Sequence, residues 1–358
     1  MDIYNLSIKE LLHHKLYMHR EFCSPERLSA YDLKELANMR ERQKKRSLAL
    51  AMELKSLVTL FSENNIRFIV LKGLPLSVKL YGDISRRPSK DIDILVKEDD
   101  FEKMIAILKP GYEIEKNFFA RSHAHLLIKN RFNGNIHEIH LRLLHNKYLF
   151  DKFDPFGCKS DIINVLGMKL PVLPSPYDLI YFIIHGAIHS WFRLFWLKDL
   201  SEFCSRSNFN MPELLKLSEE YGVTRIVASS LITCNRILAK PELTQALKSY
   251  ADKDKHINTL TNLNLSSIKS SIPPNTSEAL KIKAINKYKL LRHCLLLRKD
   301  MKYKIVSLLS NFSPSENALT LPLPEKYHFL YLFLHPILAC YRWYGAKYLG
   351  KKAHLHFK

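Results

Sequence analysis

The chain has 358 residues, of which 47% are hydrophobic and 25% are charged, with only ten glycines. This composition is typical of a globular protein and excludes disordered, fibrous and collagen-like chains. Lys and Arg number 55 against 35 Asp and Glu, so the formal net charge is +20. The expected partners are therefore polyanions such as nucleic acids, nucleotides, acidic glycans or an anionic membrane face.

The cysteines and the N-terminus predict a cytoplasmic protein. The six cysteines are scattered and form no CxxC pair, which favours reduced thiols over disulfides or a zinc ribbon. The first residues lack the cationic and apolar pattern of a signal peptide. No segment reaches the roughly 18 consecutive apolar residues that a membrane-spanning helix needs.

The first part of the chain combines helices with short apolar segments. Residues 1–65 are predicted to be helical, with a helix start at Ser24-Pro25-Glu26 that has an N-cap serine, a proline and an early acid. Short predicted strands and helices then alternate: strands at 67–71, 92–96, 124–129 and 135–141, and helices at 73–81 and 99–108. This order predicts a small mixed sheet with helices packed on it, which ends near the proline-rich segment 171–176.

Helical periodicity dominates the second half of the chain. It covers residues 177–190, 193–204, 211–221, 224–239, 277–297 and 325–349. We therefore predict an α+β fold with an α/β-type core of mixed sheet and flanking helices, followed by an all-helical C-terminal domain. The predicted parts are a helical segment at 1–65, the α/β core at 66–170 and the helical domain at 171–358.

Two aspartates in the segment DIDILV are candidate metal ligands. Alternate residues of a strand share a face, so Asp91 and Asp93 point the same way while Ile92 and Ile94 point into the core. Two adjacent carboxylates repel each other unless a cation lies between them, and Mg²⁺ is the usual partner of such a pair. Glu138, in the predicted strand 135–141, is placed to supply a third carboxylate. The alternative is an exposed strand end with incidental acids.

The stretch from about residue 66 to 144 resembles nucleotidyltransferases of the DNA polymerase β superfamily. It carries Leu71-Lys72-Gly73, Arg87-Pro88-Ser89 and DIDILV, and it is similar to a bacterial family of uncharacterised nucleotidyltransferases and, more distantly, to nucleotidyltransferase toxins. The resemblance implies a polymerase-β-like fold. It also implies that Asp91, Asp93 and Glu138 are the catalytic, metal-binding acids.

The resemblance further implies a set of nucleotide-binding residues. Lys72 and Gly73 precede a predicted helix, whose N-terminal amides can hold phosphates, and Arg87 and Ser89 match positions that face the phosphates. The superfamily's Gly-Ser motif lacks its serine here, because Leu74 follows Gly73. One turn further on, Ser77 is a candidate replacement.

A second cluster lies in the helical half. His185 and His189 are four residues apart and share one helix face, but Gly186 stands where a zinc-binding HExxH motif has its glutamate. The two histidines either pack in the core or face the cleft. A similar pattern in the family implies that they face the cleft, with Lys198 and Asp199 near the nucleotide or the acceptor.

A third group of histidines lies on the predicted strands. His140 shares a strand face with Glu138 and is a further candidate for the cleft. His123 and His125 alternate on another strand, so a histidine-rich metal site of a different kind is an alternative. That alternative leaves the two aspartates unexplained.

The excess of positive charge lies mainly after residue 240. Residues 240–358 hold 20 Lys and Arg against 7 Asp and Glu. Such a surface suits a polyanionic acceptor such as tRNA or an acidic glycan, although a solvated helix face is the simpler interpretation. Residues 326–358 mix aromatic and basic side chains, as an interfacial helix at the inner face of the membrane does. They equally suit the last helix of the core.

These observations lead to one functional hypothesis and two alternatives. The resemblance implies a nucleotidyltransferase, dependent on Mg²⁺ or Mn²⁺, that transfers a nucleoside monophosphate from an NTP such as ATP to an acceptor hydroxyl or phosphate and releases pyrophosphate. The first alternative is a nucleotide- or RNA-binding protein of the same fold with little or no activity. The second is a membrane-surface protein of polysaccharide biosynthesis.

Overall fold

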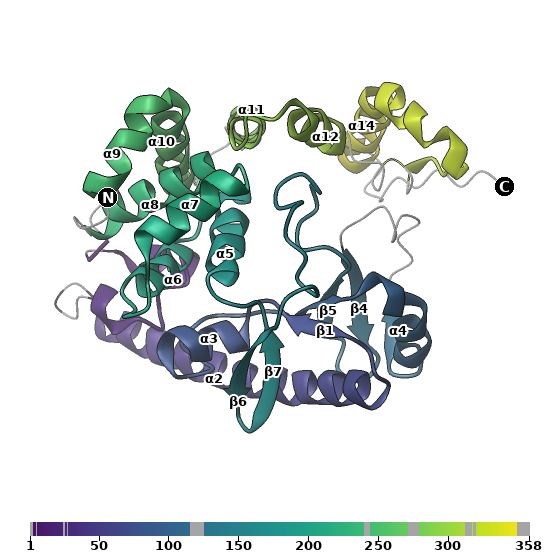
Figure 1. The fold of residues 1–358 in the computed structure, drawn as a ribbon, viewed down its shortest axis with the longest axis horizontal. Helices are drawn as coiled ribbons and strands as arrows, with labels where there is room; N and C mark the ends of the chain where they lie inside the picture. Colours follow the sequence, from purple (N-terminus) through teal and green to yellow (C-terminus); the bar gives the residue numbers. More distant parts are fainter. Residues whose placement is uncertain are drawn as a thin grey trace.

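The computed structural model describes residues 3–4, 6–23, 26, 28–114, 125–239, 244–270, 279–311, 317 and 320–348. Within them, a mixed five-stranded sheet with flanking helices lies beside a helical half that extends to the C-terminal helices (Figure 1). The predicted fold class is confirmed: an α/β-type core with a helical C-terminal region.

The N-terminal segment begins with short helices and continues into one long helix. Helix α1 (Ile8–His13) and the 3-10 helix η1 (Arg20–Phe22) precede α2 (Ala30–Glu63). Ser29 caps α2, because its hydroxyl accepts from the amide of Asp32, whose carboxylate in turn accepts from the amide of Ser29. The predicted start at Ser24-Pro25-Glu26 is wrong for this helix, although Ser24 and Pro25 lie outside the described residues.

The sheet has the strand order β1-β2-β5-β4-β3, in which β2 and β5 are parallel and the other neighbours antiparallel. Its strands and attached helices are β1 (Phe68–Val70), α3 (Leu74–Tyr81), β2 (Asp93–Val96), η3 (Glu98–Asp100), α4 (Phe101–Leu108), β3 (Tyr112–Ile114), β4 (His125–Asn130) and β5 (Ile136–His140). The sequence predicted each of these except β3 and η3.

The second half of α2 packs against one face of the sheet (Figure 1). Leu50, Leu54, Leu57 and Phe61 recur at helical spacing and are almost fully buried. They belong to one hydrophobic cluster with residues of β2 and β5, including the fully buried Ile94. This packing covers one face of the sheet and leaves the opposite face of β2 and β5 to carry polar side chains.

A hairpin that the sequence did not predict extends the α/β half. It consists of β6 (Asp161–Val165) and β7 (Met168–Val172), which contact α3 and β1 respectively. Most of β6 is exposed, and only Val165 of that strand is buried, so the alternation that marks a strand in sequence is weak there.

The helical half consists of α5 (Tyr177–Ile188), α6 (Leu194–Cys204), α7 (Met211–Glu220), α8 (Thr224–Leu238), α9 (Thr244–Lys253), α10 (Lys255–Ser270), α11 (Ala279–Leu296), α12 (Met301–Asn311), η5 (Glu325–Leu330) and α14 (Tyr331–Tyr348). The sequence missed α9, α10 and α12. Among the described residues, no helix is long and apolar enough to cross a membrane.

The N-terminal segment is shared between the two halves. Leu11, Leu16 and Phe22 are buried in the same hydrophobic cluster as α5 and α6, whereas the second half of α2 packs under the sheet. The division into 1–65, 66–170 and 171–358 stays a prediction.

Candidate active site

Two predicted acids meet where β2 and β5 run side by side. The register pairs Asp93 with Glu138 and places His140 beside Leu95. Because the strands are parallel, Asp93, Glu138 and His140 project from the same face. One ligand atom from each of the three lies within 4.8 Å of the others. The two acids are far apart in sequence, and the strand pairing brings them together.

Positive charge already surrounds Asp93, which is almost fully buried. Lys72 Nζ lies 3.1 Å from Asp93 Oδ1, and His140 Nε2 lies 3.2 Å from the same oxygen and 3.4 Å from Glu138 Oε2. Burial raises the pKa of Asp93, but Lys72 and His140 outweigh this effect and hold it well below its ordinary value. For Glu138, the hydrogen bond with His140 lowers the pKa more than burial raises it.

The same contacts favour the charged forms of the two bases. Burial lowers the pKa of Lys72 and of His140, but the neighbouring carboxylates outweigh it and raise both pKa values. The charged Lys72 and His140 thus occupy the place next to two ionised acids, Asp93 and Glu138, where a metal cation would neutralise them. Two carboxylates, together with the imidazole of His140 once it has lost its proton, are a donor set that suits a divalent ion such as Mg²⁺ or Mn²⁺, so the residues fit the metal that the resemblance implies.

Asp91 precedes β2 and lies outside the group of converging ligand atoms, but it lines the same cavity. Burial raises the pKa of its carboxyl, and the negative charge of Asp93 raises it further. The predicted triad is therefore met by two acids in direct register, with the third beside them.

A cavity of about 470 Å³ opens above these residues, within the size range of small-molecule sites. Nine of the predicted residues line it: Lys72, Arg87, Ser89, Asp91, Asp93, Glu138, His140, His185 and His189. Sequence reasoning missed several others, among them Lys15, Lys90, Tyr181, Phe192, Phe195 and Trp196.

Gly73 shapes the side of the cavity next to Lys72. It caps α3 with a φ of 75°, in the left-handed region that glycine tolerates best. A Cβ there would lie 3.4 Å from Ser89 Oγ, and the Ser89 hydroxyl donates to the carbonyl of Asp91 at 3.1 Å. The glycine therefore lets the loop that carries Ser89 and Asp91 pack against the start of α3.

A buried ion pair holds Arg87 in the cavity wall. The Arg87 Nε donates to Asp199 Oδ2 at 2.8 Å, and the Tyr81 hydroxyl donates to Asp199 Oδ1 at 2.7 Å. Asp199 is fully buried, which raises its pKa, and it is not among the described residues that line the cavity. In the structure Asp199 holds the Arg87 guanidinium, and its contact with the nucleotide stays a prediction.

Two further predicted residues lie away from the cavity lining described here. The Ser77 hydroxyl is fully buried, donates to the carbonyl of Asp83 at 2.6 Å and accepts from the Arg87 amide at 3.0 Å. It therefore holds the loop before Arg87 and does not replace the missing serine of the Gly-Ser motif. Lys198 pairs with Glu21 and Glu202.

An aromatic wall faces the carboxylates across the cavity. The ring centroids of His185 and His189 are 4.9 Å apart, and Trp196 lies 5.9 Å and 5.5 Å from them. Burial lowers the pKa of His185 well below its ordinary value, so its ring is neutral near pH 7. Of the alternative histidine pair, His125 lines the cavity and His123 lies outside the described residues.

The N-terminal segment contributes Lys15. Its backbone has a φ of 56°, and its ammonium lies 5.4 Å from the ring centroid of Phe195. Burial, with smaller contributions from Lys90 and Arg193, lowers the pKa of Lys15 to about 8. Only the packing of the N-terminal segment against α6 places it here, and no motif in the sequence marks it.

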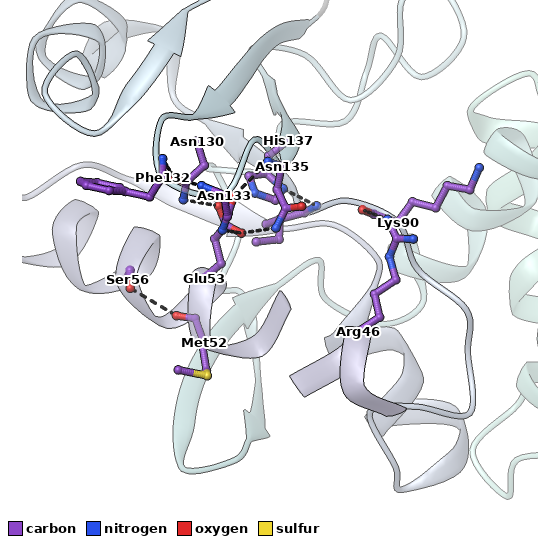
Figure 2. A network of polar contacts seen from close by, with 11 residues as sticks. Arg46, Met52, Glu53, Ser56, Lys90, Asn130, Phe132, Asn133, Asn135 and His137 are labelled. Carbon is purple, nitrogen blue, oxygen red and sulfur yellow. Dashed lines mark hydrogen bonds and ion pairs between the residues drawn. The ribbon is translucent and has the colours of Figure 1, made fainter. Parts of the chain in front are cut away.

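A buried carboxylate on α2 supports the strand that carries Glu138. Figure 2 shows Glu53 with four side chains from β4, β5 and the turn between them directed at it. Its oxygens accept from Asn130 at 2.6 Å, Asn133 at 3.2 Å and Asn135 at 2.9 Å, and they lie 2.8 Å from His137 Nε2. Sequence reasoning missed this network, although the three asparagines and His137 mark the turn and the strand next to Glu138.

The network reaches β2 and β5 through His137. Its Nδ1 accepts from the amide of Ile92 at 3.3 Å, and its Nε2 lies 2.8 Å from Glu53 Oε1. Nearby, Arg46 of α2 donates to the carbonyl of Lys90 at 3.1 Å (Figure 2). Helix α2 therefore anchors both the segment before Asp93 and the strand that carries Glu138.

A mixed sheet with acids converging on two parallel strands, beside a basic and aromatic cavity, is the architecture of a nucleotidyltransferase. A model of the family described as "Uncharacterised nucleotidyltransferase" matches residues 3–239, more than half of the chain, so the chain belongs to this family. The match runs from the N-terminal segment to the end of α8 and includes every residue of the cavity lining named above. Neither the curated proteins nor the solved structures gave a match.

Proposed function

We propose that the protein is a metal-dependent nucleotidyltransferase that transfers a nucleoside monophosphate from an NTP to an acceptor hydroxyl or phosphate and releases pyrophosphate. The observation that carries the proposal is the register of Asp93 and Glu138 on parallel strands, under a cavity that also holds Lys72 and Arg87. A cavity lined by both acids and bases suits a ligand that is both a metal chelator and a polyanion.

Asp91, Asp93 and Glu138 would hold Mg²⁺ or Mn²⁺, with His140 beside them. Such an ion, when bound, neutralises charge on the phosphates and makes an acceptor hydroxyl easier to deprotonate. Without the ion, Lys72 and His140 neutralise Asp93. Once the ion neutralises the acids in their place, Lys72 and His140 are free to turn towards the phosphates.

The remaining cavity residues bind and orient the nucleotide. Lys72 and Arg87 attract the triphosphate, and the buried Asp199 keeps the Arg87 guanidinium in one orientation. The neutral ring of His185, with His189 and Trp196, offers flat surfaces on which a base stacks. Together these groups exclude water from the transferred phosphoryl group, which strengthens each electrostatic contact.

The test is label transfer from α-labelled NTPs to components of a cell extract in the presence of Mg²⁺ or Mn²⁺. The Asp93→Asn variant should lose transfer by about 100-fold or more. The matched control is Asp99→Asn, which removes the same charge from an exposed residue beyond β2 and should transfer normally. Equal labelling by Asp93→Asn and the native chain would refute the assignment.

The alternative of a binding protein without transferase activity is favoured by Leu74, which stands where a serine is expected. A titration with Mn²⁺ and a non-hydrolysable NTP analogue separates the two. Binding that depends on Asp93, combined with no label transfer to any fraction of the extract, supports the binding protein.

We further propose that residues 326–358 contact an anionic membrane surface. Phe333, Ile337, Tyr341 and Tyr344 are exposed at helical spacing on α14, whereas Tyr331 and Leu338 of the same helix are buried. A helix that is apolar on both faces usually buries both of them, one against the protein and the other against a second surface. Flotation with anionic vesicles tests this: Phe333→Ser with Ile337→Ser should abolish it, and unchanged flotation would contradict the proposal.

A further inference from the structure

A second cavity of about 400 Å³ adjoins the first on the far side of the aromatic wall. It lies between the end of α5, the turn that follows it, α10 and α11. Ile188, His189 and Phe192 line both cavities. A ligand in the second cavity would therefore lie one side chain away from a nucleotide in the first.

The second cavity is cationic. Arg193 and Lys289 line it, and none of the described lining residues is an acid. Arg193 donates to the carbonyl of His13, and Lys289 Nζ donates to Ser266 Oγ at 3.3 Å, so both bases contact neutral oxygens. Positive charge that no carboxylate compensates within a cavity attracts an anionic ligand.

A buried histidine in this cavity has a free acceptor nitrogen. Thr233 Oγ1 donates to the carbonyl of Ser229 at 2.7 Å, so it accepts from Asn264 Nδ2 at 3.1 Å. Asn264 therefore presents its oxygen to His293 Nε2 at 2.7 Å, and that nitrogen carries the proton. Burial lowers the pKa of His293 to about 4, so the ring is neutral. His293 Nδ1 is left as a buried acceptor without a partner among the described residues.

The turn after α5 supplies a second buried polar atom. Ser190 Oγ is buried and has no partner among the described residues. Ser190 and Trp191 both have a φ of 52°, a conformation that costs roughly 1–3 kcal/mol for each non-glycine residue. The fully buried Trp191 holds this turn, since its Nε1 donates to Ser230 Oγ at 2.9 Å and its ring packs on Gly186. Strain that packing maintains next to an unsatisfied hydroxyl indicates a binding site.

We propose that this second cavity binds the acceptor, and that the acceptor is a small phosphorylated sugar or polyol. Arg193 and Lys289 bind its phosphate, while His293 Nδ1 and Ser190 Oγ hydrogen-bond to its hydroxyls. The cavity volume falls within the range of about 300–1,000 Å³ for small-molecule sites, which favours a small acceptor over a macromolecule.

The transfer step deepens the proposed function and rests on it. A hydroxyl oxygen of the bound acceptor, on the side of His189 and Phe192, forms a bond to the α-phosphorus of the NTP. The bond between that phosphorus and the oxygen bridging to the β-phosphate breaks, pyrophosphate leaves with the electron pair, and the hydroxyl proton passes to water. The product is a nucleotide joined to the phosphorylated acceptor.

Binding is tested first, by calorimetry on the full chain in EDTA without nucleotide, so that the result is independent of transferase activity. The probes are ribose 5-phosphate, glucose 6-phosphate, ribose and inorganic phosphate. At least one sugar phosphate should bind tenfold or more tightly than ribose and inorganic phosphate. Sugar phosphate binding by a native chain that transfers no label would refute only the proposed function, and label transfer without sugar phosphate binding would refute only the present inference.

Variants locate the binding. Lys289→Ala should weaken it about tenfold, the cost of one charge-assisted contact, whereas Lys55→Ala, an exposed lysine of α2, should have no effect. His293→Phe removes the free acceptor but alters a buried site, so Ser190→Gly provides a second variant. It removes the hydroxyl and relieves the left-handed backbone, and it should weaken sugar phosphate binding without weakening inorganic phosphate binding.

Three outcomes would overturn the proposal. The first is that no sugar phosphate binds more tightly than inorganic phosphate. The second is that Lys289→Ala and Ser190→Gly both bind as the native chain does. The third is that tRNA takes up label from α-labelled NTPs while no sugar phosphate binds, because the acceptor would then be a macromolecule.

Discussion

Removing the Glu53 carboxylate should destabilise the sheet more than any other single change on α2 that leaves the apolar core intact. Glu53→Ala leaves three asparagine amides without their acceptor and removes the carboxylate next to the fully buried His137. Hydrogen bonds to a charged group contribute about 1.5–3 kcal/mol each. The exposed Asn133 and the half-buried Asn135 can regain water, so we expect the free energy of unfolding to fall by about 3–5 kcal/mol.

The assay is urea unfolding followed by circular dichroism, with Glu63→Ala as the control. Glu63 is an exposed glutamate at the end of the same helix, so its loss should change the free energy of unfolding by less than about 0.5 kcal/mol. Hydrogen exchange should show that Glu53→Ala opens β5 and the turn before it more than α8. A loss below about 1 kcal/mol for Glu53→Ala would refute the reasoning, because the four contacts would then be worth little more than one exposed pair.

Three further predictions address other parts of the molecule. Gly186→Ala should lower the free energy of unfolding by about 1–3 kcal/mol, because its Cβ would lie 2.5 Å from the buried ring of Trp191; a gain of stability in urea, as helix propensity alone predicts, would contradict this. Asp199→Asn should raise the KM for NTP and destabilise the fold by about 3–5 kcal/mol, because it leaves the buried charge of Arg87 unpaired; an unchanged KM would show that this pair does not position the guanidinium. Burial raises the pKa of Glu53, but its hydrogen bonds outweigh this effect and lower the pKa below 4.5. The difference in the free energy of unfolding between the native chain and Glu53→Gln should therefore be largest above pH 4.5 and should shrink as the pH falls through the lowered pKa. A difference in urea titrations that does not depend on pH would contradict this prediction.

The family, the fold class and the acids of the site were accessible from the sequence because their signals are local. Alternation of apolar and acidic residues within a few positions marks a buried strand with one polar face, and Asp93 and Glu138 both stand in such segments. Gly73 is also identified by a local signal, because it lies between a predicted strand and a predicted helix. The boundaries of α3, β2, β4 and β5 follow from the same short-range patterns, and the structure moves them by one or two residues at most.

Tertiary structure alone decided which distant residues share the site. Nothing near Lys15 or Glu53 in the sequence connects them with the DIDILV strand, because their positions depend on how distant helices pack, which no single segment of the sequence shows. The same holds for Asp199, which the sequence places near the nucleotide and the fold places behind Arg87. Polar side chains carry no periodic signal of their partners, so only the packed chain shows which of them face the ligand and which hold the residues that do.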